Sequence, residues 1–273
     1  MQIDEIPNPF HDVKELKPII EVQNIYVPDI DNPNISRRNG GVWVACGSGG
    51  SGKSSLILSM FKSKLYYRNK FDNIFYICPS VSFNSVKNHP FAEHDKVYHE
   101  LTIPVLQDIY DSLADDTPKV TKSKEKKNRK KPQFEQIESE DDAEEEEEEK
   151  EPEYSCLILD DFADALKQKE IQKFLSKMLI KSRHLKLHII ITLQSWKYLP
   201  LMLRKQTTFM SCWKPKSMTE WFAVADEVFN LKKEHALQMY NYVFDEDYAH
   251  LDVDCVQNKY FKNFNELKIT EKI

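Results

Sequence analysis

The feature that most constrains the fold of this chain is a glycine-rich octapeptide, GSGGSGKS, at residues 47–54. An apolar run, GVWVAC at 41–46, precedes it, and a segment with apolar residues at helical spacing, 53–67, follows it. The order strand, GxxxxGK[ST], helix is typical of a phosphate-binding loop. Glycine permits the backbone to wrap a phosphate with inward-pointing N–H groups, and the helix N-terminus adds a partial positive charge.

The loop also contains the side chains that a nucleoside triphosphate needs. Lys53 is expected to reach the β- and γ-phosphates, and the Ser54 hydroxyl to coordinate Mg²⁺. ATP and Mg²⁺ are therefore the expected cofactors. All six glycines of the chain lie between Gly40 and Gly52, which argues against an incidental flexible turn. The residues expected to bind the nucleotide are Gly47, Ser48, Gly49, Gly50, Ser51, Gly52, Lys53, Ser54 and Ser55.

A pair of acidic residues ends the next strongly apolar strand, CLILDD at 156–161. Magnesium-dependent phosphate chemistry needs a carboxylate near the loop, and Asp160 is assigned to the metal together with Ser54. Asp161 is then expected to orient or deprotonate the attacking water. Many ATPases have Glu here, and Asp is one methylene shorter. The alternative for such a pair is a helix N-cap or a turn.

A fourth strand, LHIIITL at 187–193, ends in the polar residue Gln194. With one strand, 73–78, between the loop strand and the acidic strand along the chain, this order fits the P-loop branch that adds a strand beside the loop strand. Gln194 is expected to contact the γ-phosphate or the attacking water and to sense hydrolysis. The alternative is a polar residue that simply leaves the sheet.

The remaining pattern alternates strands with amphipathic helices, which predicts an α/β fold with a mostly parallel sheet and helices on both faces. Helices are expected at 105–113 and 169–182, and a weaker strand at 207–213. The first 40 residues and the region after about 245 are expected to add edge strands.

The predicted domain organisation is an N-terminal extension at 1–37 and one nucleotide-binding domain at 38–273. Residues 117–152 contain nine Lys/Arg and 13 Asp/Glu, basic first and acidic later. Such a composition buries too little apolar surface to offset its ordering entropy, so a disordered insertion is expected. Outside it the charges nearly balance, so the net charge of −6 does not argue against a nucleic-acid partner.

No apolar run approaches the roughly 18 residues of a membrane span, and the N-terminus has no secretory signal. The five cysteines include no CxxC pair, and four of them lie in or beside apolar strands. A soluble, intracellular protein with free cysteines is the expectation.

The positive charge that stabilises the transition state is expected from an arginine. Arg183 is the first candidate and Arg204 the second, whereas His184 is interpreted as structural. Basic residues that flank the last strands are candidates for contacts to DNA phosphates, with a solvated surface as the alternative: Lys197, Arg204, Lys205, Lys214 and Lys216.

Together, GSGGSGKSSLI, YICPS, CLILDD, the Arg183–His184 pair and ITLQS resemble the packaging ATPases of large double-stranded DNA viruses, the poxvirus-type members of the FtsK–HerA superfamily. The resemblance covers residues 38–215 without the insertion. It implies a RecA-like core and a homo-oligomeric ring, pentameric or hexameric, that pumps duplex DNA using ATP. It also implies Arg183 as a finger acting on a neighbouring subunit, capsid or membrane portal proteins as partners, and a place in the host-cell cytoplasm (the viral factory) and in the virion.

Four other functions share the phosphate loop. A nucleotide or small-molecule kinase would have an arginine-rich lid, and the longest inserted segment here is rich in Lys and Glu instead. A GTPase would have an NKxD-like guanine reader, and Asn258–Lys259 is followed by Tyr260 and Phe261. A scaffold without turnover would not need Asp160 and Asp161. Another DNA-translocating or helicase-like ATPase also remains an alternative.

Overall fold

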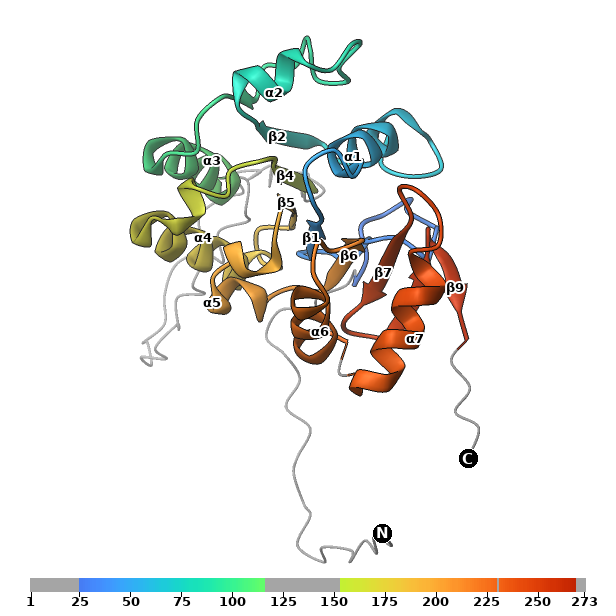
Figure 1. The fold of residues 1–273 in the computed structure, drawn as a ribbon. Coiled ribbons are helices and arrows are strands. Elements are labelled where there is room, and N and C mark those ends of the chain that lie inside the picture. The colour runs from blue at the N-terminus through green and yellow to red at the C-terminus, as the bar shows by residue number, and fades with distance from the viewer. Residues whose placement is uncertain (1–24, 116–152, 230, 269–273) are drawn as a thin grey trace, which may run out of the picture.

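The computed structural model describes residues 25–115, 153–229 and 231–268. Nine strands form one sheet in the order β3-β2-β4-β5-β1-β6-β7-β8-β9, with helices packed around it (Figure 1). The pairs among β1 to β6 are parallel, and β7, β8 and β9 continue the sheet in antiparallel fashion. The predicted α/β class with a mostly parallel sheet is confirmed.

The strands are β1 (Val42–Cys46), β2 (Asn73–Ile77), β3 (Val97–Tyr98), β4 (Ser155–Leu159), β5 (Leu187–Leu193), β6 (Phe209–Trp213), β7 (His250–Asp254), β8 (Lys259–Lys262) and β9 (Asn265–Leu267). The α-helices are α1 (Lys53–Lys62), α2 (Ser80–Asn84), α3 (Ile103–Asp115), α4 (Lys169–Lys181), α5 (Leu201–Arg204), α6 (Met218–Glu227) and α7 (Lys233–Val243). Two short 3₁₀ helices cover Ala165–Lys167 and Trp196–Tyr198.

Both faces of the sheet are buried, which explains why its strands are almost continuously apolar. Along β1, Val42 and Val44 pack into one core with α3, α4, α5, α6 and α7. Trp43 and Ala45 point the other way, into a second core with α1 and the segment before β1. Side chains of a strand alternate between faces, so a strand between two helical layers must be apolar at every position.

The sheet order brings three carboxyl ends together. β1 lies between β5 and β6, and β5 in turn pairs with β4. In register, Cys46 is opposite Leu193, and Leu159 is opposite Ile191. The segments that follow these strands therefore leave the sheet at one edge, here called the loop edge. The strand that lies between the loop strand β1 and the acidic strand β4 is β5.

Several boundaries differ from the sequence expectation. The helix expected at 53–67 ends at Lys62, because the chain turns there and places Tyr67 in the second core, with its hydroxyl donating to the Ser36 carbonyl oxygen. The C-terminal edge strands are confirmed as β7, β8 and β9. The N-terminal expectation is wrong for residues 25–40, which add no strand to the sheet and form an isolated antiparallel bridge between Tyr26 and Arg38.

The charged insertion expected at 117–152 and most of the extension at 1–37 lie outside the described residues. The domain division therefore stays a prediction. Cys46, Cys78, Cys156 and Cys212 are free and buried, as expected for cysteines in or beside apolar strands. Within residues 25–115, 153–229 and 231–268, no helix is both long and apolar enough to cross a bilayer.

His188 of β5 makes the stability of the fold depend on pH. Its ring is completely buried and packs against Phe71 and Tyr67, and its Nδ1 donates to the Arg38 carbonyl oxygen over 3.3 Å. Burial lowers the pKa of His188 from 6.5 to about 4. Between about pH 6.5 and pH 4, His188 therefore binds a proton in the unfolded chain and stays neutral in the folded chain. The free energy of unfolding falls as the pH drops through this range.

We expect this one residue to remove about 2 kcal/mol of unfolding free energy between pH 7 and pH 5. The measurement is urea unfolding at both pH values for the wild type and for His188→Gln, which retains a donor and has no charge to gain. The pH dependence should be shallower in the variant by that amount. Equal slopes in the two proteins would contradict a neutral buried His188.

Candidate functional site

The phosphate loop has the backbone that its glycines permit. Gly50 and Gly52 have φ angles of 78° and 94°, and Gly52 is the N-cap of α1. A side chain at Gly47 is excluded by space, since a Cβ there would lie 2.7 Å from the Cβ of Trp213. The loop starts where β1 ends, and the Gly47 N–H donates to the Leu193 carbonyl oxygen over 3.0 Å.

Lys53 is folded back into this loop. Its side chain is 8% exposed, and its Nζ donates to the carbonyl oxygens of Gly47 and Ser48 over 2.7 and 2.9 Å. Burial lowers the pKa of Lys53 below its ordinary value, and nearby negative charges, including Asp160 and Asp161, oppose that shift. The ammonium group thus lies at the centre of the concave loop, where a bound phosphate would meet it.

The two residues assigned to magnesium touch each other across 106 positions of sequence. Ser54 Oγ donates to Asp160 Oδ1 over 2.9 Å, and Asp160 is 3% exposed. A hydroxyl and a carboxylate beside a phosphate site match the way Mg²⁺ binds in nucleotide sites, with one or two protein oxygens and the rest from phosphates and water. The donor set therefore fits the metal.

Asp160 is held by two further hydroxyl groups that the sequence did not single out. Tyr76 of β2 donates to Oδ2 over 2.9 Å, and Thr192 of β5 donates to Oδ1 over 2.6 Å. Both residues lie within strands, where they look like ordinary sheet residues. They can be identified only by their position on the two strands next to β4, so the strand order must be known first.

Asp161 and Gln194 also meet. Gln194 Nε2 donates to Asp161 Oδ1 over 3.1 Å, and both side chains are exposed at the loop edge. Asp161 has a φ of 62°, a left-handed conformation that Asp and Asn tolerate better than most residues. Its N–H donates to Thr192 Oγ1 over 3.0 Å. One threonine hydroxyl thus positions both aspartates.

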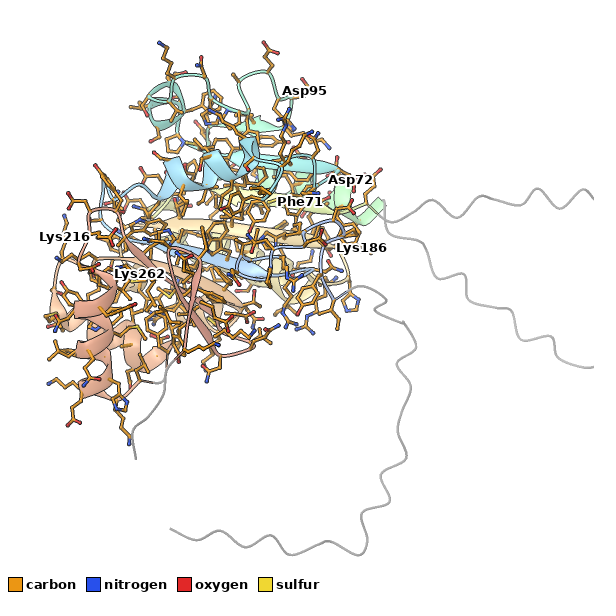
Figure 2. All side chains as sticks on the ribbon, turned by 90° about the vertical axis from the view of Figure 1, so that its right-hand side faces the viewer. Phe71, Asp72, Asp95, Lys186, Lys216 and Lys262 are labelled. Carbon is orange, nitrogen blue, oxygen red and sulfur yellow. The ribbon has the colours of Figure 1, made fainter. Side chains whose placement is uncertain are left out.

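Arg183 is not part of this cluster. It is exposed and lies next to Gly40, where a Cβ would be 2.5 Å from the backbone nitrogen of Arg183. Gly40 precedes β1 and the phosphate loop follows it, so about 20 Å of extended chain separates them. Figure 2 shows the two edges: Lys216, after β6, is at one side of the view and Lys186, just before β5, at the other.

The second candidate arginine is already engaged. Arg204 Nη1 is 2.7 Å from Glu227 Oε2, and its side chain is 19% exposed. The expected DNA contacts do not form one surface, because Lys197, Lys214 and Lys216 follow strands at the loop edge, whereas Arg204 and Lys205 end α5 and lead back to the start of β6.

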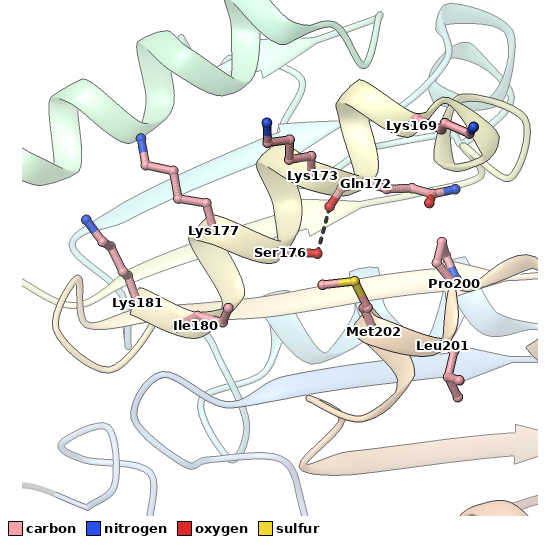
Figure 3. A pocket seen from close by; sticks show the side chains of 10 residues that line it. All are labelled: Lys169, Gln172, Lys173, Ser176, Lys177, Ile180, Lys181, Pro200, Leu201 and Met202. Atoms are coloured by element: carbon pink, nitrogen blue, oxygen red, sulfur yellow. Dashed lines mark hydrogen bonds between the residues drawn. The ribbon is translucent and has the colours of Figure 1, made fainter.

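One cavity adjoins the site, and a larger groove lies elsewhere on the described part of the chain. A cavity of about 270 Å³ adjoins the loop and is lined by Gly47, Gln194, Trp213, Lys216 and Glu220 among others. A larger groove of about 670 Å³ lies between α4 and α5, away from the loop (Figure 3). Residues that line the groove are Lys169, Gln172, Lys173, Ser176, Lys177, Ile180, Lys181, Pro200, Leu201 and Met202.

Four lysines of α4, spaced four residues apart, lie along this groove. Their spacing can be read from the sequence, but the expectations drawn from the sequence did not include it. All four are exposed, and none makes an ion pair within the described part of the chain. In Figure 3, Lys173, Lys177 and Lys181 extend from α4 on the side away from Met202. Lys177 and Lys181 contact Tyr110 of α3.

The fold and the loop with its acid pair define a P-loop NTPase in which one strand, β5, lies between the loop strand and the acidic strand. Residues 42–268 match the family described as Poxvirus A32 protein. The chain belongs to this family, and the resemblance to the poxvirus-type ATPases is confirmed. No curated protein matches the sequence in a direct comparison.

Solved structures of viral ATPases share the fold. B204, the DNA-packaging ATPase from Sulfolobus turreted icosahedral virus, is 14% identical with a TM-score of 0.55, and the match covers 85% of this chain and 98% of B204. The genome packaging NTPase B204 from Sulfolobus turreted icosahedral virus 2, in complex with ATPγS, is also 14% identical, with a TM-score of 0.54 and coverage of 85% and 99%.

Proposed function

We propose that this chain is a viral genome-packaging ATPase, a motor that hydrolyses ATP to move double-stranded DNA into the capsid. One observation carries the chemistry: a phosphate loop, a Ser–Asp pair suited to Mg²⁺ and an Asp–Gln pair meet at one edge of the sheet. Family membership and the likeness to proteins whose names include DNA packaging support the biological role.

Each part of the cluster has one task in this proposal. The backbone of residues 47–55 and Lys53 bind the triphosphate, and Ser54 with Asp160 holds Mg²⁺. The metal, when bound, neutralises charge that develops on the phosphate oxygens. Asp161 accepts a proton from the attacking water or orients it, and Gln194, which contacts Asp161, reports whether the γ-phosphate is present.

Arg183 enters only through a second subunit. It lies on the edge opposite the phosphate loop, so it cannot reach the nucleotide of its own chain. It is exposed, and a ring brings one edge of a subunit against the other edge of its neighbour. A homo-oligomeric ring of five or six chains, with Arg183 acting in trans, is the arrangement that uses this residue as a finger.

The remaining partners follow from the motor role. Duplex DNA is bound without regard to sequence through lysine and arginine contacts to phosphates. The α4 lysines are a further candidate contact in addition to Lys197, Lys214 and Lys216, because four unneutralised cations in one row attract a polyanion. Capsid or membrane portal proteins are the docking partners, and the place of action is the viral factory in the host cytoplasm and the virion.

The test is the ATPase rate with and without double-stranded DNA, at several protein concentrations. We expect DNA to raise the rate, and the rate per subunit to increase with concentration as rings form. A rate that does not depend on DNA, together with transfer of phosphate to a metabolite, would instead favour the alternative function, a nucleotide or small-molecule kinase.

Lysine variants test the DNA contacts themselves, through the salt dependence of DNA affinity. In Lys169→Ala/Lys173→Ala, which spares the two lysines that contact Tyr110, the logarithm of DNA affinity should depend less steeply on the logarithm of salt concentration, by a slope of about two. The ATPase rate without DNA should not change. The matched control is Lys232→Ala/Lys233→Ala, at the start of α7. An equal slope in both double variants would remove α4 from the DNA surface.

A further inference from the structure

Tyr248 is the least explained aromatic residue near the site. It lies in the turn between α7 and β7, and 71% of it is exposed. Its φ of 63° is a left-handed conformation that bulky residues rarely adopt. Its ring stacks on no other ring, and its hydroxyl bonds no group, within residues 25–115, 153–229 and 231–268. Neither burial in the core, nor a ring contact, nor a hydrogen bond within these residues accounts for an aromatic ring held this way.

The ring lies beside the phosphate loop. If Gly52, the N-cap of α1, carried a Cβ, that atom would lie 3.5 Å from Cδ1 of Tyr248. The next residues along the chain are anchored: Ala249 and His250 are buried, and His250 packs on Trp213 with ring centroids 4.9 Å apart. Tyr248 is therefore an exposed ring on a backbone anchored by buried neighbours, close enough to the loop that a side chain at Gly52 would touch it.

The sheet order decides which end of a nucleotide this ring would meet. Asp160, Asp161 and Gln194 follow β4 and β5, on one side of β1. Tyr248 precedes β7, on the other side, beyond β6. If the γ-phosphate and the metal of a bound triphosphate lie toward the acid pair, its ribose and base extend from the loop on the opposite side. Tyr248 lies on that side.

We propose that Tyr248 stacks on the base of the bound nucleotide. This deepens the proposed function, on which it rests for the identity of the ligand as a nucleoside triphosphate. Stacking accepts any flat aromatic base, so Tyr248 contributes affinity for the nucleoside part and little discrimination between adenine and guanine. Tyr248 is a binding residue and takes no part in the reaction of the phosphates.

The test compares MgATP with magnesium tripolyphosphate, which has the phosphates and lacks the base. The variant is Tyr248→Asn, because Asn adopts a positive φ readily and so removes the ring without disturbing the turn. We expect the dissociation constant of MgATP to rise about tenfold, as for other base–aromatic stacks, while that of tripolyphosphate stays the same. Tyr248→Phe, which keeps the ring, should bind both ligands like the wild type.

Two outcomes overturn the stacking proposal: unchanged ATP affinity in Tyr248→Asn, or an equal loss for both ligands. Replacement with tryptophan gives a second readout, since its fluorescence should change on addition of ATP and not of tripolyphosphate. The packaging proposal fails separately: a wild-type protein that binds ATP through Tyr248 and is not stimulated by DNA would refute the motor and leave the stacking intact.

Discussion

Replacing Lys53 with alanine is expected to abolish ATP hydrolysis, with a rate at least about a hundredfold below that of the wild type. The Nζ of Lys53 lies inside the loop, 2.7 Å from the Gly47 carbonyl oxygen. Its charge compensates the phosphate oxygens, where charge develops in the transition state. The measurement is phosphate release at saturating MgATP.

Lys62→Ala is the matched control for this experiment. Lys62 is at the other end of α1, and its Nζ donates to the Asn88 carbonyl oxygen at an exposed position. The control should hydrolyse ATP like the wild type and unfold at nearly the same urea concentration. If Lys53→Ala kept more than about a tenth of the wild-type rate, the loop would not be the catalytic phosphate site.

Asp161→Asn is expected to stop turnover and leave MgATP binding intact. Loss of a general base lowers rates by about 10²–10⁴. Asn has the same size, tolerates the φ of 62° that this position requires and can still bond to Gln194, so the backbone and the neighbours of Asp161 should stay in place. What disappears is the negative charge that draws the proton of the attacking water.

Binding and turnover must be measured separately for this variant, by equilibrium titration with MgATP and by single-turnover hydrolysis. Asp164→Asn serves as the control, because Asp164 is an exposed neighbour that pairs with Lys167 and not with the site. Near-normal turnover in Asp161→Asn would show that another group activates the water. A loss of ATP binding equal to the loss of rate would indicate a role in nucleotide affinity instead.

The sequence was a good guide to the groups that follow strands. Parallel strands of one sheet end at the same edge, so the loop after β1, the acid pair after β4 and Gln194 after β5 were expected at one edge once those runs were recognised as strands. The motif also specified the backbone, since only glycine accommodates φ angles such as 94° at Gly52 without strain. These features are encoded within a few residues of one another.

Contacts between distant segments could not be obtained in this way. Tyr76 and Thr192 hold Asp160 because β2 and β5 flank β4, and no local pattern distinguishes them from other strand residues. Tyr248 reaches the loop only because β7 runs antiparallel next to β6. The distance of Arg183 from the phosphate loop and the absence of a strand at 25–40 likewise depend on packing across the whole sheet.

Local sequence therefore specified the class of fold, the phosphate loop and the chemical groups placed at strand ends, because short-range backbone geometry and apolar periodicity leave few alternatives. Strand order and register, which set the partners of Asp160, the neighbour of Gly52 and the edge on which Arg183 lies, were specified by the folded structure. They depend on burying both faces of one sheet at once, a condition to which residues throughout the chain contribute and which no single segment contains.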